Sequence, residues 1–214
     1  NWGSKANDII GAVRAKWLAV LHDDDRLHPE FAARCLEVSE RGDGADVIVT
    51  DRRMFYDSQS PEQGQVFREF ASVGTENAYY VVKPPADFFR FGCTLPATCL
   101  IRTDWWKETG GFDPTMPQQD TEWHYRSAMA GARMHYVPAP LWDYRKHEEN
   151  PEERTLVRSR FLHAFHRKHF PQFGLAFDQS VEVSPRHIAV GYVPPEYREQ
   201  YIEDHYPELI GGAR

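Results

Sequence analysis

Residues 16–29 read KWLAVLHDDDRLHP, an apolar run that ends in one imidazole and three carboxylates. The run from Trp17 to Leu21 is short, continuous and flanked by polar residues, which predicts a central strand covered on both faces of a sheet. In open α/β sheets, ligands bind beyond the carboxyl ends of the strands, where we expect residues 22–25 to lie. Neighbouring carboxylates repel one another, and their hard oxygen atoms favour Mg²⁺ or Mn²⁺ as the cation that relieves this repulsion.

The three aspartates also have a plainer interpretation. A run of Asp is typical of a solvated loop, or of the cap of the helix that we expect to start near Pro29. The buried strand in front of the aspartates favours a binding site over a solvated loop.

The bulk composition describes a globular protein that does not bind nucleic acid. The chain has 214 residues, which suits one domain with an appended segment. Its net charge of -7 argues against a general nucleic-acid binder, because phosphate binding needs an excess of Lys and Arg. The cysteines Cys35, Cys93 and Cys99 lack metal-binding spacing and indicate a reducing compartment.

We expect neither a membrane span nor a signal segment in this sequence. No window approaches the roughly 20 apolar residues that a span requires, so we expect a cytoplasmic protein, either soluble or peripheral at the inner membrane face. The first residue is Asn1 rather than Met, so we also expect a fragment or a processed chain.

Helical and strand patterns alternate along the chain and predict an α/β fold. Helices are expected over residues 4–15, 30–40, 84–91, 120–130 and 151–170, with Ile9 and Leu36 among their buried residues. A strand is expected over residues 45–50 that runs into residues 54–56, followed by a loop and a return strand over residues 66–70. Further strands are expected over residues 97–102 and 133–137. Thr103 or Asp104 should cap the helix that follows residue 102, and the two glycines at 110 and 111 predict a tight turn.

Four segments together resemble glycosyltransferase family 2. The first is residues 21–29, which are similar to the family pattern Leu-Asp-x-Asp-Asp followed by a Pro. In this resemblance Asp24 is a metal ligand, assisted by Asp25, and His22, Asp23 and Asp24 contact the donor nucleotide. His22 stands where the first Asp of the pattern is common, and an imidazole can still form one hydrogen bond there.

The other three segments lie later in the chain. The sequence GGFD at residues 110–113 is a recurring feature of the family, and QQDTEW at residues 118–123 resembles its Glu-Asp motif. That motif's Asp takes the proton from the acceptor hydroxyl, a role that the resemblance gives to Asp120. Residues 141–147 resemble a Tyr-Arg-x-His ending, which implies that His147 completes the metal shell. A lone His at a strand end can equally be structural.

The resemblance covers about residues 4–147 and implies an inverting glycosyltransferase with the GT-A fold, a Rossmann-like mixed sheet flanked by helices. We therefore expect an N-terminally incomplete glycosyltransferase domain over residues 1–149, lacking the upstream nucleotide-binding strands, and a helical extension over residues 150–214. The expected cofactor is Mn²⁺ or Mg²⁺. The expected partners are a nucleotide-sugar donor and a glycan or lipid-linked acceptor.

The helix expected over residues 151–170 combines an apolar stripe of Val157, Phe161 and Phe165 with several basic residues. Such a helix either has a solvated charged face or contacts anionic lipid. The three-residue spacing of His163, His166 and His169 drifts around a helix, so we expect surface histidines rather than a zinc site.

Two other functions remain open at this point. A non-catalytic GT-A-like module would bind a partner or a glycan without binding any nucleoside diphosphate. A metal-dependent phosphoesterase would use the Asp and His cluster to hydrolyse simple phosphate esters without an acceptor.

Overall fold

The computed structural model describes residues 2–42, 44–67, 80–82 and 98–147, together with Phe161, Ala164, Phe165, Lys168 and His169. The helix predicted over residues 84–91, most of the one predicted over 151–170, Asn1, Cys93 and the remainder up to Arg214 lie outside the described residues.

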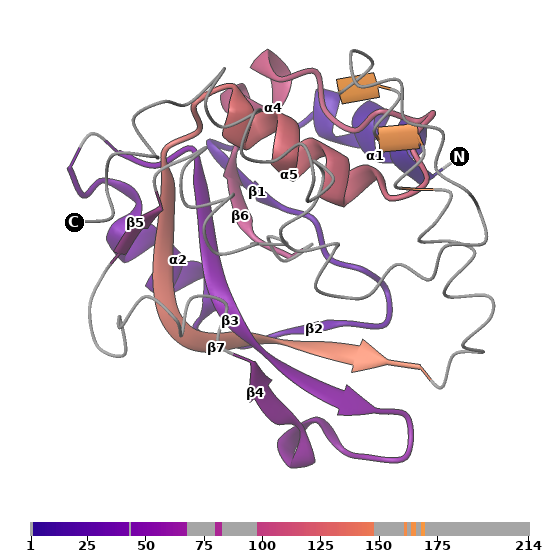
Figure 1. Cartoon of the computed structure of the whole chain (residues 1–214). Coiled ribbons are helices and arrows are strands. Elements are labelled where there is room, and N and C mark those ends of the chain that lie inside the picture. The colour runs from indigo at the N-terminus through magenta and orange to yellow at the C-terminus, as the bar shows by residue number, and fades with distance from the viewer. Residues whose placement is uncertain are drawn as a thin grey trace, which may run out of the picture.

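Within the described residues, seven strands form one mixed sheet. The strands are β1 (Trp17–Ala19), β2 (Arg26–Leu27), β3 (Val47–Tyr56), β4 (Gln65–Phe67), β5 (Tyr80–Val82), β6 (Leu100–Arg102) and β7 (Met134–Lys146). Their order is β1-β6-β3-β7-β2, with β4 paired to β3 and β5 paired to β7. The long strands β3 and β7 run parallel and side by side, as Figure 1 shows, whereas the other pairs are antiparallel.

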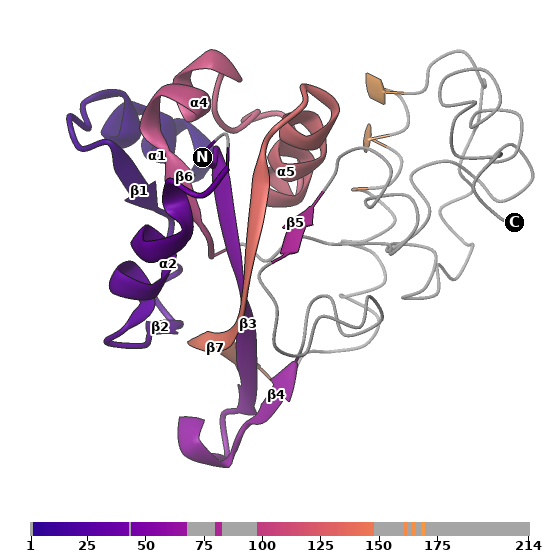
Figure 2. The same cartoon turned by 90° about the vertical axis from the view of Figure 1, so that its left-hand side faces the viewer.

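Helices cover both faces of this sheet. They are α1 (Trp2–Gly11), α2 (Phe31–Ser39), α4 (Thr103–Glu108) and α5 (Gln119–Met129), with a 3-10 turn η1 (Pro61–Gln63) before β4. Figure 2 shows α2 and α5 on opposite sides of β3 and β7. Successive side chains of a strand point to opposite faces, so Val47 and Val49 join the core that contains Trp123 of α5, while Ile48 joins the core that contains Phe31 of α2.

The strand buried on both faces is β3, not β1. Val47, Ile48 and Val49 expose no surface, whereas β1 stands at one end of the strand order and buries only Leu18. The prediction of a central strand at residues 17–21 is therefore wrong. A continuous apolar run shows that a strand contacts a core, but it does not show how many strands flank it.

Four local predictions are also wrong. Helix α1 spans Trp2–Gly11 rather than residues 4–15, and Ile9 is 70% exposed because Ile10 takes the inward position. Leu36 of α2 is likewise exposed. Neither Thr103 nor Asp104 is the N-cap of α4. They are its first two residues, because β6 continues directly into the helix with Arg102 as the N-cap.

The remaining element predictions that fall on described residues agree with the structure in type. The helices near residues 30–40 and 120–130, the β3–β4 hairpin and the glycine turn are all present. The strand predicted over residues 133–137 is longer than expected, because β7 continues through Pro138 and Pro140 to pair with β2. Phe161 and Phe165 are helical and buried in the core that contains Trp123 of α5, in agreement with the apolar stripe predicted for the helix over residues 151–170.

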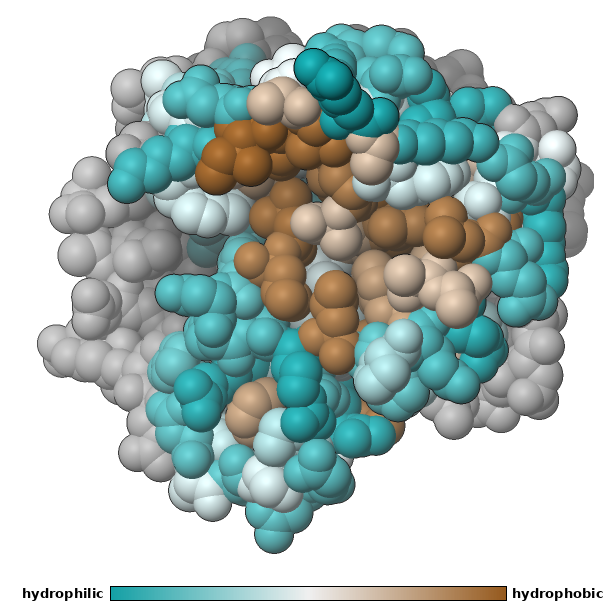
Figure 3. Space-filling model, turned by 180° about the vertical axis from the view of Figure 1, so that it is seen from behind, coloured by the Kyte–Doolittle hydropathy of each residue, from teal (hydrophilic) through white to brown (hydrophobic). Residues whose placement is uncertain are grey.

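The face that carries α1, β1 and α2 is partly apolar. Figure 3, seen from behind, shows hydrophobic surface across the middle of this face, framed by hydrophilic side chains. The exposed large apolar residues on these elements and just after β1 include Ile9, Leu21 and Leu36. No helix among the described residues is both long enough and apolar enough to span a membrane.

Candidate active site

Residues 22–25, called here the acid turn, connect β1 to β2. The backbone amide of Asp25 donates to the carbonyl of His22 at 3.2 Å, which closes the turn. Immediately afterwards, β2 pairs with β7 through Arg26 opposite Asp143 and Leu27 opposite Trp142. The acid turn is therefore fixed beside the last residues of β7.

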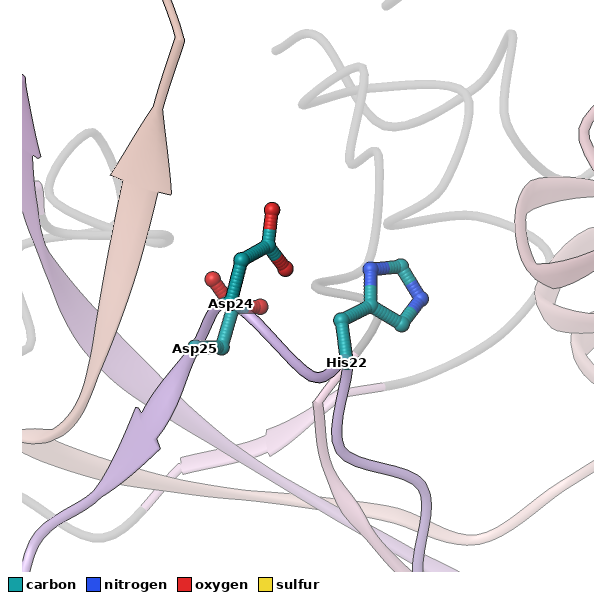
Figure 4. A group of neighbouring side chains, drawn as sticks. All are labelled: His22, Asp24 and Asp25. Carbon is teal, nitrogen blue, oxygen red and sulfur yellow. The ribbon is translucent and has the colours of Figure 1, made fainter. Parts of the chain in front are cut away.

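The acid turn brings three potential metal ligands together. One ligand atom from each of His22, Asp24 and Asp25 lies within 4.8 Å of the others, and all three residues are half-buried. Figure 4 shows their side chains projecting from the same side of the turn. Asp23, which the sequence also singled out, is exposed and stands outside this group.

Asp25 has one satisfied and one unsatisfied carboxylate oxygen. Its Oδ1 accepts a hydrogen bond from the backbone amide of Arg145 at 3.0 Å. Its Oδ2 is buried and has no hydrogen-bond partner among the residues that the structure describes. Burial raises the pKa of Asp25 to about 6, against the opposing effect of the Arg145 amide. A buried carboxylate oxygen without a partner is costly, and a cation would satisfy it.

His147 reaches the acid turn from the end of β7. Its Nε2 lies 2.8 Å from Oδ2 of Asp24, although 123 residues separate the two in sequence. Its Nδ1 lies 3.2 Å from Oδ2 of Asp57. These two hydrogen bonds raise the pKa of His147. Burial alone would raise the pKa of Asp24, but hydrogen bonds, led by that with His147, lower it below its ordinary value.

The acid turn has ligands that suit a divalent cation. Asp24 and Asp25 offer hard carboxylate oxygens, one of them buried without a partner among the described residues, and His22 offers an imidazole nitrogen in the same group. His147 lies outside this group and contacts it through Asp24. A mixed set of carboxylates and imidazole suits Mn²⁺, and a set dominated by carboxylates suits Mg²⁺.

Asp120 is the second residue of α5 and is half-buried. The described contacts do not join it directly to the acid turn. Instead, the first turn of α1 touches both regions. The Trp2 ring stands edge-on to His22 at 5.5 Å between centroids, and a Cβ on Gly3 would lie 1.9 Å from Oε1 of Gln119. The acid turn and the start of α5 therefore border the same segment of α1.

Glu122 is a charged residue of this region that sequence reasoning missed. Its side chain is completely buried and accepts hydrogen bonds from Arg126, from Lys168 Nζ at 2.8 Å and from His169 Nε2 at 3.0 Å. Burial would raise its pKa, but these hydrogen bonds, led by that from His169, lower the pKa to about 2. The i, i+4 spacing of Glu122 and Arg126 was the available sequence signal.

Two partners of Glu122, Arg126 and Lys168, also contact the glycine turn that precedes α5. Arg126 donates to the carbonyls of Thr109 and Gly111, the second at 2.5 Å. Lys168 also donates to Oδ2 of Asp113 at 2.6 Å. His169 is thus not a free surface histidine as expected, because it contacts a buried carboxylate.

Comparison with protein families gives one match. Residues 3–165 match the model described as glycosyltransferase like family 2. A search of curated proteins finds no match.

Solved structures with a similar fold include several of S. aureus TarS. The structure of its residues 1–349 in complex with UDP-GlcNAc has 14% identity and a TM-score of 0.53, and the comparison covers 94% of this chain and 59% of that one. The same fragment in complex with UDP has 12% identity, a TM-score of 0.51, and 94% and 57% coverage. The chain therefore spans less than two thirds of these proteins. At this identity the likeness shows the fold alone, which is the GT-A-like mixed sheet flanked by helices that the sequence predicts.

Proposed function

The chain belongs to glycosyltransferase-like family 2, and on this basis we propose that it transfers a sugar from a nucleotide-sugar donor to an acceptor hydroxyl. The observation that carries the proposal is the acid turn, where His22, Asp24 and Asp25 converge with His147 inside the matched region. The complexes of TarS with UDP-GlcNAc and UDP make uridine nucleotides the first donors to test.

Asp24, Asp25 and His147 are the residues that we propose to hold a divalent cation, Mn²⁺ or Mg²⁺. When bound, such a cation supplies positive charge to a diphosphate leaving group. The half-buried position of Asp24 and Asp25 supports this assignment, because exclusion of water strengthens charge interactions. His22 has a ring nitrogen available for one hydrogen bond to the donor, and Asp23 lies at the exposed rim of the same turn.

Asp120 is the residue that we propose as the base. It removes the proton from the acceptor hydroxyl while the new bond to the anomeric carbon forms and the bond to the diphosphate breaks. An in-line displacement of this kind inverts the anomeric centre. The acceptor that we propose is a hydroxyl of a glycan or of a lipid-linked sugar. The buried network of Glu122 holds the first turn of α5 and thereby the backbone that carries Asp120.

The test is the identity of the product. The protein is incubated with a panel of nucleotide sugars and of glycan acceptors, with Mn²⁺ or with chelator, and the nucleotide product is identified by chromatography. We expect a nucleoside diphosphate, released only with the metal. In Asp120→Asn we expect release to fall by about 10²- to 10⁴-fold, the usual contribution of a general base. Asp104→Asn is the matched control, because Asp104 is also the second residue of its helix.

The other outcomes separate the rival functions. A nucleoside monophosphate with a sugar phosphate would identify a phosphoesterase. Cleavage of no donor would favour the non-catalytic module. Full activity of Asp120→Asn would remove Asp120 from the mechanism while leaving the transferase assignment in place.

A further inference from the structure

We propose that Asp57 is a positioning residue that orients His147 toward the cation of the acid turn. The inference rests on the proposed metal-assisted function and adds to it a residue outside the four segments that resemble the family. Asp57 lies just beyond β3, whereas its partner His147 lies just beyond β7.

The strand register brings the two residues together. In the parallel pairing of β3 with β7, the last pair is Tyr56 opposite Lys146, so the next residue of each strand lies at the same end of the sheet. Gln59 fixes the turn after β3 through two hydrogen bonds with Tyr56. The backbone N–H of Gln59 donates to the carbonyl of Tyr56 at 2.9 Å, and the side-chain Oε1 of Gln59 accepts from the backbone N–H of Tyr56 at 3.1 Å. Asp57 therefore leaves β3 in a defined direction.

The two nitrogens of His147 face different carboxylates. Nδ1 lies 3.2 Å from Oδ2 of Asp57, and Nε2 lies 2.8 Å from Oδ2 of Asp24. A neutral imidazole has one N–H and one lone pair. Because both nitrogens face carboxylate oxygens, the ring without a cation donates from both. If a cation takes the place of the Nε2 proton, Asp57 keeps the remaining N–H on Nδ1, and the Nε2 lone pair is then directed to the cation beside Asp24. A carboxylate that fixes the tautomer and the ring orientation in this way is typical of metal-ligating histidines.

Arg145 holds the other oxygen of Asp57. Its Nε lies 3.3 Å from Oδ1 of Asp57, while its backbone amide donates to Asp25. The carboxylate of Asp57 is therefore held between a guanidinium and an imidazole, and one residue, Arg145, contacts both Asp57 and the acid turn. This arrangement suits a group that acts through His147 rather than as a ligand itself.

Both side chains of this pair are exposed, so the effect of Asp57 on metal binding can be measured without loss of the fold. The side chains of Asp57 and His147 are 45% and 50% exposed. Exposed ion pairs contribute little to the stability of the fold, because water screens them. We therefore expect variants of Asp57 to fold normally and to differ from the natural protein in metal affinity.

The experiment measures Mn²⁺ affinity from the electron paramagnetic resonance signal of free Mn²⁺, on the complete chain. Asp57→Ala should weaken binding by about 10- to 100-fold, the usual effect of losing the partner of a ligating histidine. Asp57→Asn should lose less, because the amide oxygen still accepts the Nδ1 hydrogen. Glu62→Gln is the matched control, since Glu62 is an exposed carboxylate of the same hairpin that pairs with Arg26 instead. The thermal midpoint without metal should not change in any of these variants.

A double-mutant cycle decides whether Asp57 acts through His147. In His147→Ala, the further change Asp57→Ala should have no additional effect on Mn²⁺ affinity. The proposal is overturned if Asp57→Ala binds Mn²⁺ as the natural protein does. It is also overturned if the loss persists in the His147→Ala background, which would make Asp57 a ligand or a long-range charge. Absence of Mn²⁺ binding by the natural protein would contradict the metal-assisted function, and this inference with it.

Discussion

Glu122 shows how one buried side chain ties separate segments of this protein together. Its carboxylate is completely buried, whereas its partners Arg126 and Lys168 are each about one quarter to one third exposed. Lys168 lies 46 residues away and also contacts Asp113. A buried charge with this many donors is stable in place, but removal of the charge would leave the donors unpaired.

We predict that Glu122→Gln destabilises the fold by about 3 kcal/mol near neutral pH, the lower end of the usual cost of breaking a buried ion pair. The pKa of Glu122 is lowered from 4.5 to about 2, so its ionised form stabilises the folded state above about pH 4.5. That contribution is lost as the pH falls from 4.5 toward 2, and the natural protein and the variant should converge there. Urea unfolding at several pH values measures both effects.

Glu37→Gln is the matched control for this prediction. Glu37 also pairs with an arginine four residues later, but both side chains are largely exposed. Its loss should cost less than about 0.5 kcal/mol at any pH, as for other surface pairs. Equal effects of the two substitutions, or a Glu122 effect that does not depend on pH, would contradict the account of this network.

At the residue scale, sequence could predict the groups that carry chemistry but not the groups that hold them. Local motifs suggest a chemical role for some residues without any knowledge of the fold, namely Asp24, Asp25, Asp120 and His147. Asp57 could not be found in this way, because its contact with His147 depends on the register of two long strands 90 residues apart.

At the scale of elements, the glycine turn at residues 109–114 links α1 to α5. Gly110 and Gly111 both have positive φ, at 77° and 65°. The side-chain amide of Asn7 in α1 donates to the carbonyl of Phe112 at 2.7 Å and accepts from its backbone amide at 2.9 Å. A Cβ on Gly111 would lie 2.5 Å from Oδ1 of Asn7, whereas a Cβ on Gly110 would meet nothing closer than 4.0 Å. The turn therefore requires Gly111 for space as well as for its backbone conformation.

We predict that Gly111→Ala destabilises the protein more than Gly110→Ala does. Both changes add strain of about 1–2 kcal/mol at a positive φ. Gly111→Ala should cost about 1–2 kcal/mol more, because it also displaces the Asn7 side chain from its hydrogen bonds. Urea unfolding of the two variants measures the difference directly. Equal losses would show that contact with Asn7 does not constrain the turn.

Periodicity predicted the type of most elements but not their partners. The helix pattern near α2 and the β-branched run in β3 were sufficient to predict a helix and a strand, because the type of each element depends on its own residues. The apolar run of β1 was misassigned as central, because its pairing with β6 joins residues such as Trp17 and Arg102 that are distant in sequence. Thr103 was misassigned as a cap because the chain passes from β6 into α4 without an intervening residue.

At the scale of the whole molecule, the sheet brings the candidate site together. The acid turn connects β1, at one end of the strand order, to β2, at the opposite end, where β2 pairs with β7. This path carries Asp24 to His147 and Asp25 to Arg145. The order of the motifs along the chain predicted the family, whereas the strand order that makes their meeting possible had to be observed.

The central claim is that this chain binds a nucleotide-sugar donor through a divalent cation at the acid turn. The most direct test is thermal stability against a panel of nucleoside diphosphates and nucleotide sugars, each with Mn²⁺ and with chelator. A ligand at about 100-fold above its Kd stabilises the folded state by about 2.7 kcal/mol, which is an easily measured shift. We predict stabilisation by one nucleotide and its sugar derivative, with Mn²⁺ and not with chelator. No stabilisation by any ligand, or stabilisation that chelator leaves unchanged, would contradict the claim.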